Sequence, residues 1–233
     1  MAPKEDRDPF DLTDEFSPPR EYLSDRIVIK YEQSKFDSEN KKFLPEGCIN
    51  DLVTLETIMK EIKEVNMLEP EELILQEGTH KKAIVDFARG RGMKLFAISV
   101  VSSLCGNELV RAMSQFMDVD FSDRSLPVEE EEEDGSKDPF FRDKKSSPWS
   151  KTRIHVFCQE QWRFLAPVFT QQNFKVDLKA GHILPFIEKG TLVREGAFGQ
   201  VFQVEIHPAH QEDPVLNVRI SQYLLLLSQM TAL

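Results

Sequence analysis

Cysteine is scarce in this sequence, and the positions of its few cysteines exclude most cysteine chemistry. Cys48, Cys105 and Cys158 are widely separated, and no C-x-x-C pair or other zinc-ligand spacing occurs. Their odd number is also untypical of a disulfide framework. We therefore expect reduced, partly buried thiols in an intracellular protein, without distinguishing cytoplasm from nucleus.

Long apolar segments are absent as well. The longest apolar run is Tyr223–Leu227, far below the ~20 residues that span a bilayer. Residues 1–6 contain no apolar run, so no secretory signal is predicted. No membrane partner is therefore expected.

Basic residues are fewer than acidic residues in this sequence. The chain has 40 acidic and 29 basic residues, a formal net charge of -11. Such a chain repels a phosphate backbone, so we expect no nucleic-acid partner. The short basic clusters, such as Lys41–Lys42 and Lys144–Lys145, are flanked by acidic residues and are interpreted as solvated surface.

The sequence divides into regions in which apolar residues recur at regular spacing and regions in which they do not. The first residues are rich in Asp, Glu and Pro, which predicts disorder. The consecutive glutamates Glu129–Glu133 repel one another and predict a solvated linker. We expect six segments: a disordered tail (1–20), a helical region (21–127), an acidic flexible linker (128–148), a helix with a lead-in (149–185), a strand hairpin (186–210) and an atypical C-terminal tail (211–233).

Apolar residues spaced by three and four predict several helices. The first follows Pro45 and has its apolar positions between Ile49 and Ile62. Others are expected over Ala83–Ala88 with Thr79 as the cap, from Asn107 onward and over Trp149–Leu165. Met93–Leu104 is apolar nearly all round and fits a buried helix or a buried strand, and its helical neighbours favour helix. Leu73–Leu75 is interpreted as a packed turn, and Tyr22–Ile29 as helix or strand. The predicted fold is mainly α, with a helical N-terminal region, a C-terminal β-hairpin and a disordered N-terminus and linker.

The hairpin is predicted around the letters REGAFGQV, Arg194–Val201. Strand-like residues precede the two glycines from Phe186, and a second run continues to Ile206. In this second run Phe202, Val204 and Ile206 fall on one face, which is the period of a strand. Two strands joined by a glycine turn predict a hairpin over 187–206.

The segment Arg194–Pro208 resembles the glycine-rich loop and second strand of a eukaryotic-type protein kinase domain. Phe157–Phe169 and Asp177–Phe186 resemble the lead-in found in a group of fungal protein-kinase-like proteins. The resemblance makes residues 186–210 a partial kinase small lobe. Its parent activity is ATP-dependent Ser/Thr phosphorylation, with ATP and Mg as the implied cofactors. The implied cofactor-binding residues are Gly196, Ala197, Phe198, Gly199 and Val201.

These residue types suit a nucleotide. Glycine backbones approach phosphate oxygens without a Cβ in the way, and exposed N–H groups bind anions. The resemblance places Phe198 at the tip as a shield against water, and Val201 over the adenine ring.

The sequence departs from the kinase pattern at several positions. Arg194 stands where the family has its first glycine, and the last lysine, Lys189, precedes the loop. The region of the third strand offers only Arg219, which does not replace the phosphate-binding lysine. No H-R-D or D-F-G sequence occurs. We expect a kinase fragment without phosphotransfer and with negligible ATP binding, ending in a tail unrelated to the family.

Two other functions remain open. Residues 40–180 can act as a non-catalytic helical module that binds a partner or a kinase lobe in trans. Alternatively, the glycine match is accidental in an acidic binding protein, which a helix over 187–206 would favour. For the tail itself, the alternative to a chain end unrelated to the family is a short C-terminal helix packed on the bundle.

Metal and nucleophile sites are not expected. His207 and His210 lie near Glu205 and Glu212, but the resemblance places the His–Pro pair in a surface loop. His155 and Cys158 are three residues apart on a predicted helix, which favours a core thiol over a nucleophilic pair.

Overall fold

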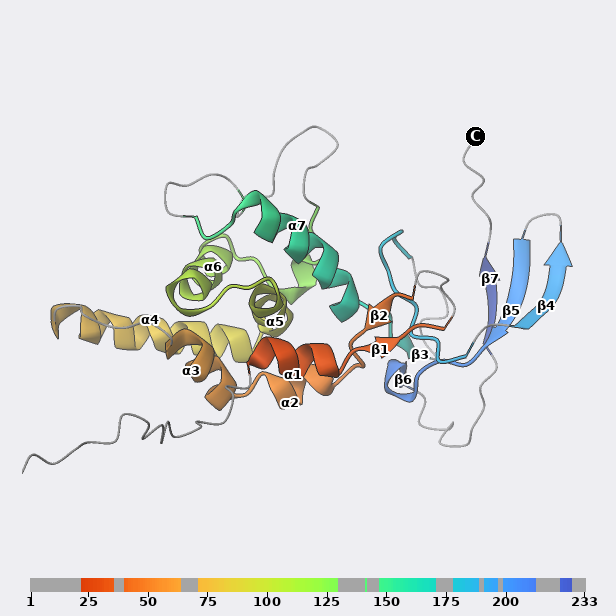
Figure 1. Cartoon of the computed structure of the whole chain (residues 1–233), viewed down its shortest axis with the longest axis horizontal. Helices are drawn as coiled ribbons and strands as arrows, with labels where there is room; N and C mark the ends of the chain where they lie inside the picture. Colours follow the sequence, from red (N-terminus) through yellow and green to blue (C-terminus); the bar gives the residue numbers. More distant parts are fainter. Residues whose placement is uncertain are drawn as a thin grey trace, which may run out of the picture.

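The computed structural model is mainly helical, as predicted, and its described residues also form three small sheets (Figure 1). It describes residues 22–35, 40–63, 71–129, 141, 147–170, 178–188, 191–196, 199–212 and 223–227. The predicted disordered tail and most of the predicted linker lie outside these ranges. The helices are α1 (Leu23–Ile29), α2 (Cys48–Leu52), α3 (Leu55–Lys63), α4 (Glu71–Arg89), α5 (Met93–Val101), α6 (Gly106–Asp118) and α7 (Lys151–Glu160).

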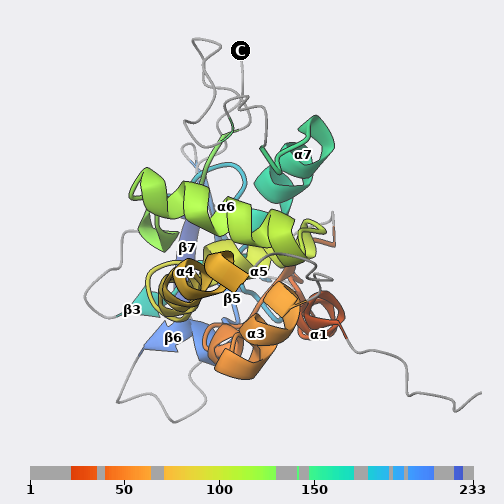
Figure 2. The same ribbon diagram turned by 90° about the vertical axis from the view of Figure 1, so that its left-hand side faces the viewer.

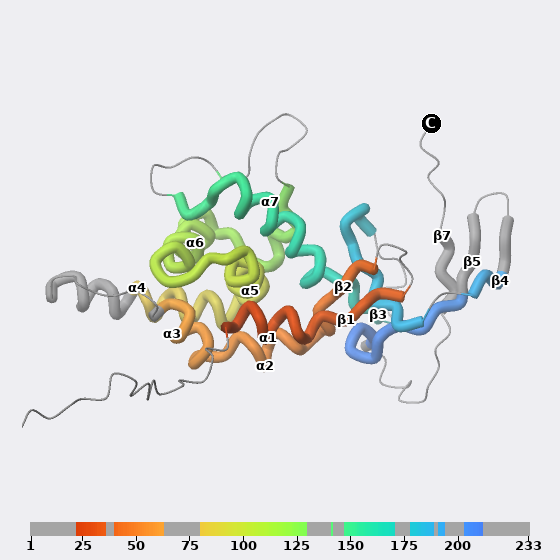
Figure 3. The backbone as a smooth tube through the Cα atoms, in the orientation of Figure 1, coloured from red at the N-terminus to blue at the C-terminus, as the bar shows by residue number. Residues whose placement is uncertain are grey.

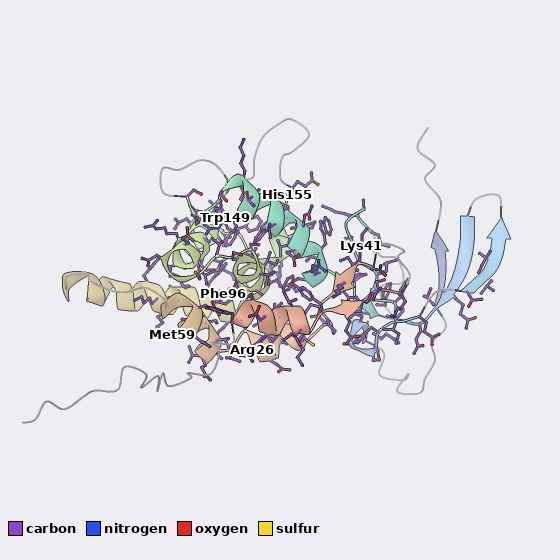
Figure 4. All side chains as sticks on the ribbon, viewed as in Figure 1. Arg26, Lys41, Met59, Phe96, Trp149 and His155 are labelled. Atoms are coloured by element: carbon purple, nitrogen blue, oxygen red, sulfur yellow. The ribbon has the colours of Figure 1, made fainter. Side chains whose placement is uncertain are left out.

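Helix α5 is the centre of the helical bundle. Its residues Leu95–Val100 are buried without exception, and α1, α4, α6 and α7 pack around it (Figure 2). Phe96, fully buried, marks this centre in Figure 4. A helix that is apolar on all sides is stable only when it is covered on all sides. The prediction of helix over this segment is confirmed.

The single helix predicted after Pro45 is wrong, because the chain forms two helices there. The break lies at Val53–Thr54, where Thr54 and Thr57 form reciprocal bonds. The Thr54 N–H donates to Thr57 Oγ1 at 2.9 Å, and the Thr57 N–H donates to Thr54 Oγ1 at 3.3 Å. Thr57 Oγ1 also donates to the Leu52 carbonyl at 2.7 Å, closing the end of α2. Apolar spacing runs through the break and hides this capping.

Helix α4 corrects a second prediction. The expected turn at Leu73–Leu75 and the expected cap at Thr79 both lie inside one continuous helix. No proline occurs between Glu71 and Arg89, so no backbone donor is missing. The glycine in this stretch, Gly78, costs a helix only about 1 kcal/mol. At the N-terminal end of the fold, the ambiguous segment is helix α1, whose Leu23 N–H donates to Glu61 Oε1 at 3.1 Å.

Helix α7 and the 3₁₀ helix η3 (Gln161–Phe164) share the bundle's core, although the sequence places them beyond a linker. Phe157 packs edge-on against Trp149, with ring centroids 5.3 Å apart. Two residues of the predicted linker, Val128 and Phe141, are themselves buried in this core. The buried Gln161 side chain accepts from the Val128 N–H at 2.8 Å and donates to its carbonyl at 2.7 Å.

The N-terminus of α5 depends on an acidic residue from outside the helix. Gly92 at the cap position has no side chain to offer. Instead, Asp123, in the 3₁₀ helix η1 (Asp123–Ser125), accepts from the N–H groups of Lys94 and Leu95, both at 3.0 Å. Burial raises the pKa of the Asp123 carboxyl, and these two donors oppose that rise.

Replacing Asp123 by alanine is therefore expected to lower the free energy of unfolding by about 1–2 kcal/mol, the usual cost of a lost helix cap. Urea denaturation of the purified chain measures this loss. Asp86→Ala, on the exposed face of α4, is the matched control and is expected to change stability by less than about 0.5 kcal/mol. Equal losses in the two variants would contradict the capping role.

Candidate functional site

The predicted hairpin is present. Strands β4 (Thr191–Gly196) and β5 (Gly199–Val204) pair antiparallel, and Gly196 lies opposite Gly199. Pairing continues beyond the two strands, since the Ile187 N–H donates to the Glu205 carbonyl at 3.0 Å and Phe186 bridges Ile206. The hairpin expected over 187–206 is confirmed, and the helix that an accidental glycine match would favour does not form.

Burial alternates along the second strand as its sequence predicts. Val204 and Ile206 are buried, whereas Gln203 and Glu205 are partly exposed. The two buried side chains join Phe186 in a small core, against which Phe169 and Leu184 pack. The base of the hairpin is therefore fixed by apolar contacts as well as by backbone pairing.

The structure brings the two glycines of the predicted phosphate loop face to face at the end of the hairpin. Val201 lies in β5 opposite Arg194. Ala197 and Phe198, predicted at the tip, lie outside the described residues. Their predicted roles, together with that of Val201 over adenine, stay predictions.

A third strand follows in the C-terminal tail. Strand β7 (Tyr223–Leu227) pairs antiparallel with β5, with Val204 opposite Tyr223 and Gln200 opposite Leu227. The alternative of a short helix is therefore wrong for these five residues, because the free edge of β5 offers backbone groups that an extended apolar run satisfies. The expected third-strand region, 215–222 with Arg219, lies outside the described residues. The strand that is described, YLLLL, has no cationic side chain.

After β5 the chain is anchored to the helical part by His210. This residue belongs to the 3₁₀ helix η4 (Pro208–His210) and is only 1% exposed. Its Nε2 accepts from the Glu46 N–H at 3.1 Å, so its Nδ1 carries the proton and donates to the Pro167 carbonyl at 3.1 Å. Burial lowers the pKa of His210, which keeps the ring neutral. The surface loop expected for the His207–Pro208 pair is present, with Pro208 exposed and His207 partly exposed, whereas the neighbouring His210 is buried.

Phe43 packs against the same histidine, and we call the contacts of His210 with Glu46, Pro167 and Phe43 the anchor. Phe43 is fully buried at the end of β2 (Lys42–Phe43), which pairs with β1 (Glu32–Gln33). Its ring lies edge-on to His207 at 5.7 Å and to His210 at 5.2 Å. His207 Nε2 in turn lies 3.3 Å from Glu32 Oε1. The segment after the hairpin thus lies beside β1 and β2 (Figure 3).

A parallel pair of short strands also holds the segment that follows His210. Strand β6 (Gln211–Glu212) pairs with β3 (Phe169–Thr170), with Phe169 opposite Gln211. Sequence reasoning missed Phe43, Glu46 and Pro167, because they contribute one ring, one N–H group and one carbonyl rather than a motif. The only signal was the His–Pro pair after the second strand.

The remaining expectations concern metal ligands, His155 and the three cysteines. Within the described residues no cluster of three His, Cys, Asp or Glu residues could hold a metal. Cys158 packs against the main core, as expected, and His155 Nε2 instead lies 3.1 Å from Gln159 Nε2. Cys48 is partly buried, but Cys105 is exposed, which corrects the expectation for that thiol.

No helix in the described part of the chain is long and apolar enough to cross a membrane. The chain matches no protein family, no curated protein and no solved structure.

Proposed function

We propose that these 233 residues correspond to a fragment of an ATP-dependent Ser/Thr protein kinase, in which a helical domain carries the glycine-rich hairpin of the small lobe, and that by themselves they do not transfer phosphate. The observation that supports this most is the hairpin itself, with Gly196 opposite Gly199 at the turn, a register shift between Leu192 and Arg194, and a further bridge between Phe186 and Ile206 at the base. A kinase phosphate loop requires this strand–turn–strand context, whereas a dinucleotide loop requires a helix after its glycines. The resemblance of the lead-in supports the same family.

The residues present do not fit Mg–ATP. In protein kinases the third strand supplies a lysine to the α- and β-phosphates, and two further side chains hold the metal ions. Strand β7 supplies no cation, and the sequence has no lysine after Lys189. Nor does it contain the H-R-D and D-F-G sequences from which the base and metal ligands come. The glycine loop therefore lacks the lysine and the metal ligands that hold the phosphates in a protein kinase.

Incubation of the purified chain with Mg–ATP labelled at the γ-phosphate tests this proposal. We expect no time-dependent incorporation of label into the chain or into a general protein substrate. We also expect no rise in Tm with ATP, because a ligand stabilises a protein only when it binds the folded form. The matched control is Gly199→Val, which places a side chain in the turn. A contaminating kinase would label the wild type and this variant equally, so the comparison separates its activity from that of the chain. Incorporation by the wild type that Gly199→Val abolishes would overturn the proposal.

A second candidate function is the binding of a partner protein or of a kinase lobe in trans by the helical domain. Helix α1 favours it, since Val28 is 47% exposed and Ile29 is 75% exposed. Capture of a purified kinase catalytic lobe by the immobilised chain tests this function. Ile29→Lys is expected to abolish the capture, and Lys60→Glu on α3 is the control. Failure of both the wild-type chain and the Lys60→Glu variant to capture the lobe would count against this candidate.

A further inference from the structure

The two histidines that follow the hairpin use their ring nitrogens in the same way. The buried His210 accepts from the Glu46 N–H at Nε2, at 3.1 Å. His207 accepts from the Ala209 N–H at Nδ1, also at 3.1 Å. A neutral imidazole has one acceptor nitrogen, whereas an imidazolium has none. Both backbone bonds therefore require the neutral form of the ring.

The two rings also lie close to one another. Their centroids are 5.8 Å apart, and the fully buried Phe43 ring contacts both of them. Two positive charges at this distance repel one another, and the repulsion is stronger beside a buried phenyl ring than in water. Protonation of both histidines therefore opposes the arrangement in which they pack against Phe43.

The carboxylates near the histidines only partly offset this effect. Glu32 Oε1, in β1, lies 3.3 Å from His207 Nε2, but the Glu32 side chain is 50% exposed, so water screens the attraction. Glu46 favours a charge on His210, but its carboxylate also lies 4.0 Å from Lys94 Nζ. Burial outweighs the attraction of Glu46 and lowers the pKa of His210.

The anchor lies at the joint between the hairpin and the helical part of the molecule. His210 contacts the Glu46 N–H just before α2 and the Pro167 carbonyl just after η3. Beside these contacts, the Lys35 N–H after β1 donates to the Phe186 carbonyl at the base of the hairpin, at 2.8 Å. A proton on His210 therefore acts on the joint and not on the glycine turn.

Apolar packing determines which part of the molecule opens first. Near the joint, the described residues form two small apolar clusters, one of Phe43, Ala166 and Ile183 and one of Phe186, Val204 and Ile206. The core around α5 contains far more buried side chains. Local opening requires the least free energy where few apolar contacts are lost. The base of the hairpin is therefore expected to open before the bundle does.

We propose that His207 and His210 form a pH-sensitive latch, which holds the base of the hairpin against the helical part of the molecule at neutral pH and releases it on acidification while the bundle stays folded. In the closed form both rings are neutral and accept their backbone bonds. In the open form, water solvates the imidazolium groups and the Glu46 N–H, which offsets the lost bonds. The latch does not depend on the proposed kinase relationship.

Hydrogen exchange of the full chain, read by mass spectrometry at about pH 7.5 and about pH 5.5, tests the latch. Each rate is divided by the intrinsic exchange rate at the same pH. We expect the protection of the Lys35 and Glu46 amides to fall by about tenfold, because a solvated histidine with a pKa of about 6.5 is about tenfold more often protonated than neutral at the lower pH. The protection of Leu95–Val100 in α5 is expected to change by less than about twofold.

His210→Gln separates the proton from the packing, because glutamine keeps one donor and one acceptor but does not titrate. In this variant we expect the protection of the Lys35 and Glu46 amides to differ by less than about twofold between the two pH values. The matched control is His182→Gln, which removes another histidine whose pKa burial lowers. This control is expected to keep the loss of about tenfold, because His182 does not belong to the anchor.

Circular dichroism establishes that each variant is folded. If His210→Gln does not fold, the wild type alone carries the test, because the latch requires the joint and α5 to respond differently to pH. Unchanged protection at the joint of the wild type, or a parallel loss at the joint and in α5, would overturn the proposal. Equal losses in the wild type and in folded His210→Gln would also overturn it.

Discussion

Phe157→Ala is expected to lower the free energy of unfolding by about 3–5 kcal/mol, the largest loss predicted for this chain. The ring is fully buried and lies among three other aromatic rings. Its centroid is 5.3 Å from that of Trp149, 6.1 Å from that of Phe116 and 6.1 Å from that of Phe141. Alanine removes these edge and face contacts and leaves a cavity that rigid neighbours fill only in part.

The same substitution tests whether α7 unfolds together with the rest of the helical bundle. Phe157 is on α7, whereas Phe116 is on α6 and Phe141 lies in the segment predicted as a linker. If α7 belonged to a separate unit, urea unfolding would show a second transition after the substitution. We expect one transition shifted to lower urea concentration, with Phe157→Leu showing a smaller shift. A loss below about 1 kcal/mol would contradict the shared core.

His210→Ala is expected to lower the free energy of unfolding by about 2–4 kcal/mol, because it removes a fully buried ring and leaves two partly buried backbone groups without partners. These are the Glu46 N–H and the Pro167 carbonyl, which the imidazole now joins. The substitution also removes the ring that Phe43 contacts at 5.2 Å. His80→Ala is the control, because it removes an exposed histidine on α4 whose Nε2 lies 2.9 Å from Ser114 Oγ, and this solvent-exposed contact is expected to contribute less than about 1 kcal/mol.

The same residue makes stability depend on pH. Burial lowers the pKa of His210 in the folded chain, so the unfolded chain, with an ordinary histidine pKa of about 6.5, binds the proton first on acidification. Stability is therefore complete above about pH 6.5 and falls as the pH drops from there toward the lowered pKa. Nearby charges that also act on this ring are His207, which opposes protonation, and Glu46, which favours it.

Urea midpoints measured at about pH 7.5 and about pH 5.5 check this sign. The wild type is expected to lose more stability between the two than His210→Ala. Burial lowers the pKa of His182 as well, so part of the pH dependence persists in the variant. Parallel pH profiles for the wild type and the variant would show that His210 is not the group responsible.

Local sequence patterns predicted most of the elements. Spacings of three and four identified α5, α6 and α7, and period two with a pair of glycines identified the hairpin. The errors arose where capping or pairing overrode those patterns. Thr54 and Thr57 break an apolar run that continues in the sequence, and β7 is a strand because β5 offers it an edge. For the site, the two glycines were found, whereas the anchor was not.

What the sequence alone determined is thus the type of most elements and the meeting of Gly196 with Gly199, because both depend on residues close in the chain. Only the tertiary structure decided that His210 is buried against Glu46 and Pro167 and that Asp123 caps α5. These contacts join residues far apart in sequence through single backbone groups. Such groups are present at nearly every position, so no pattern of residue types marks them in advance.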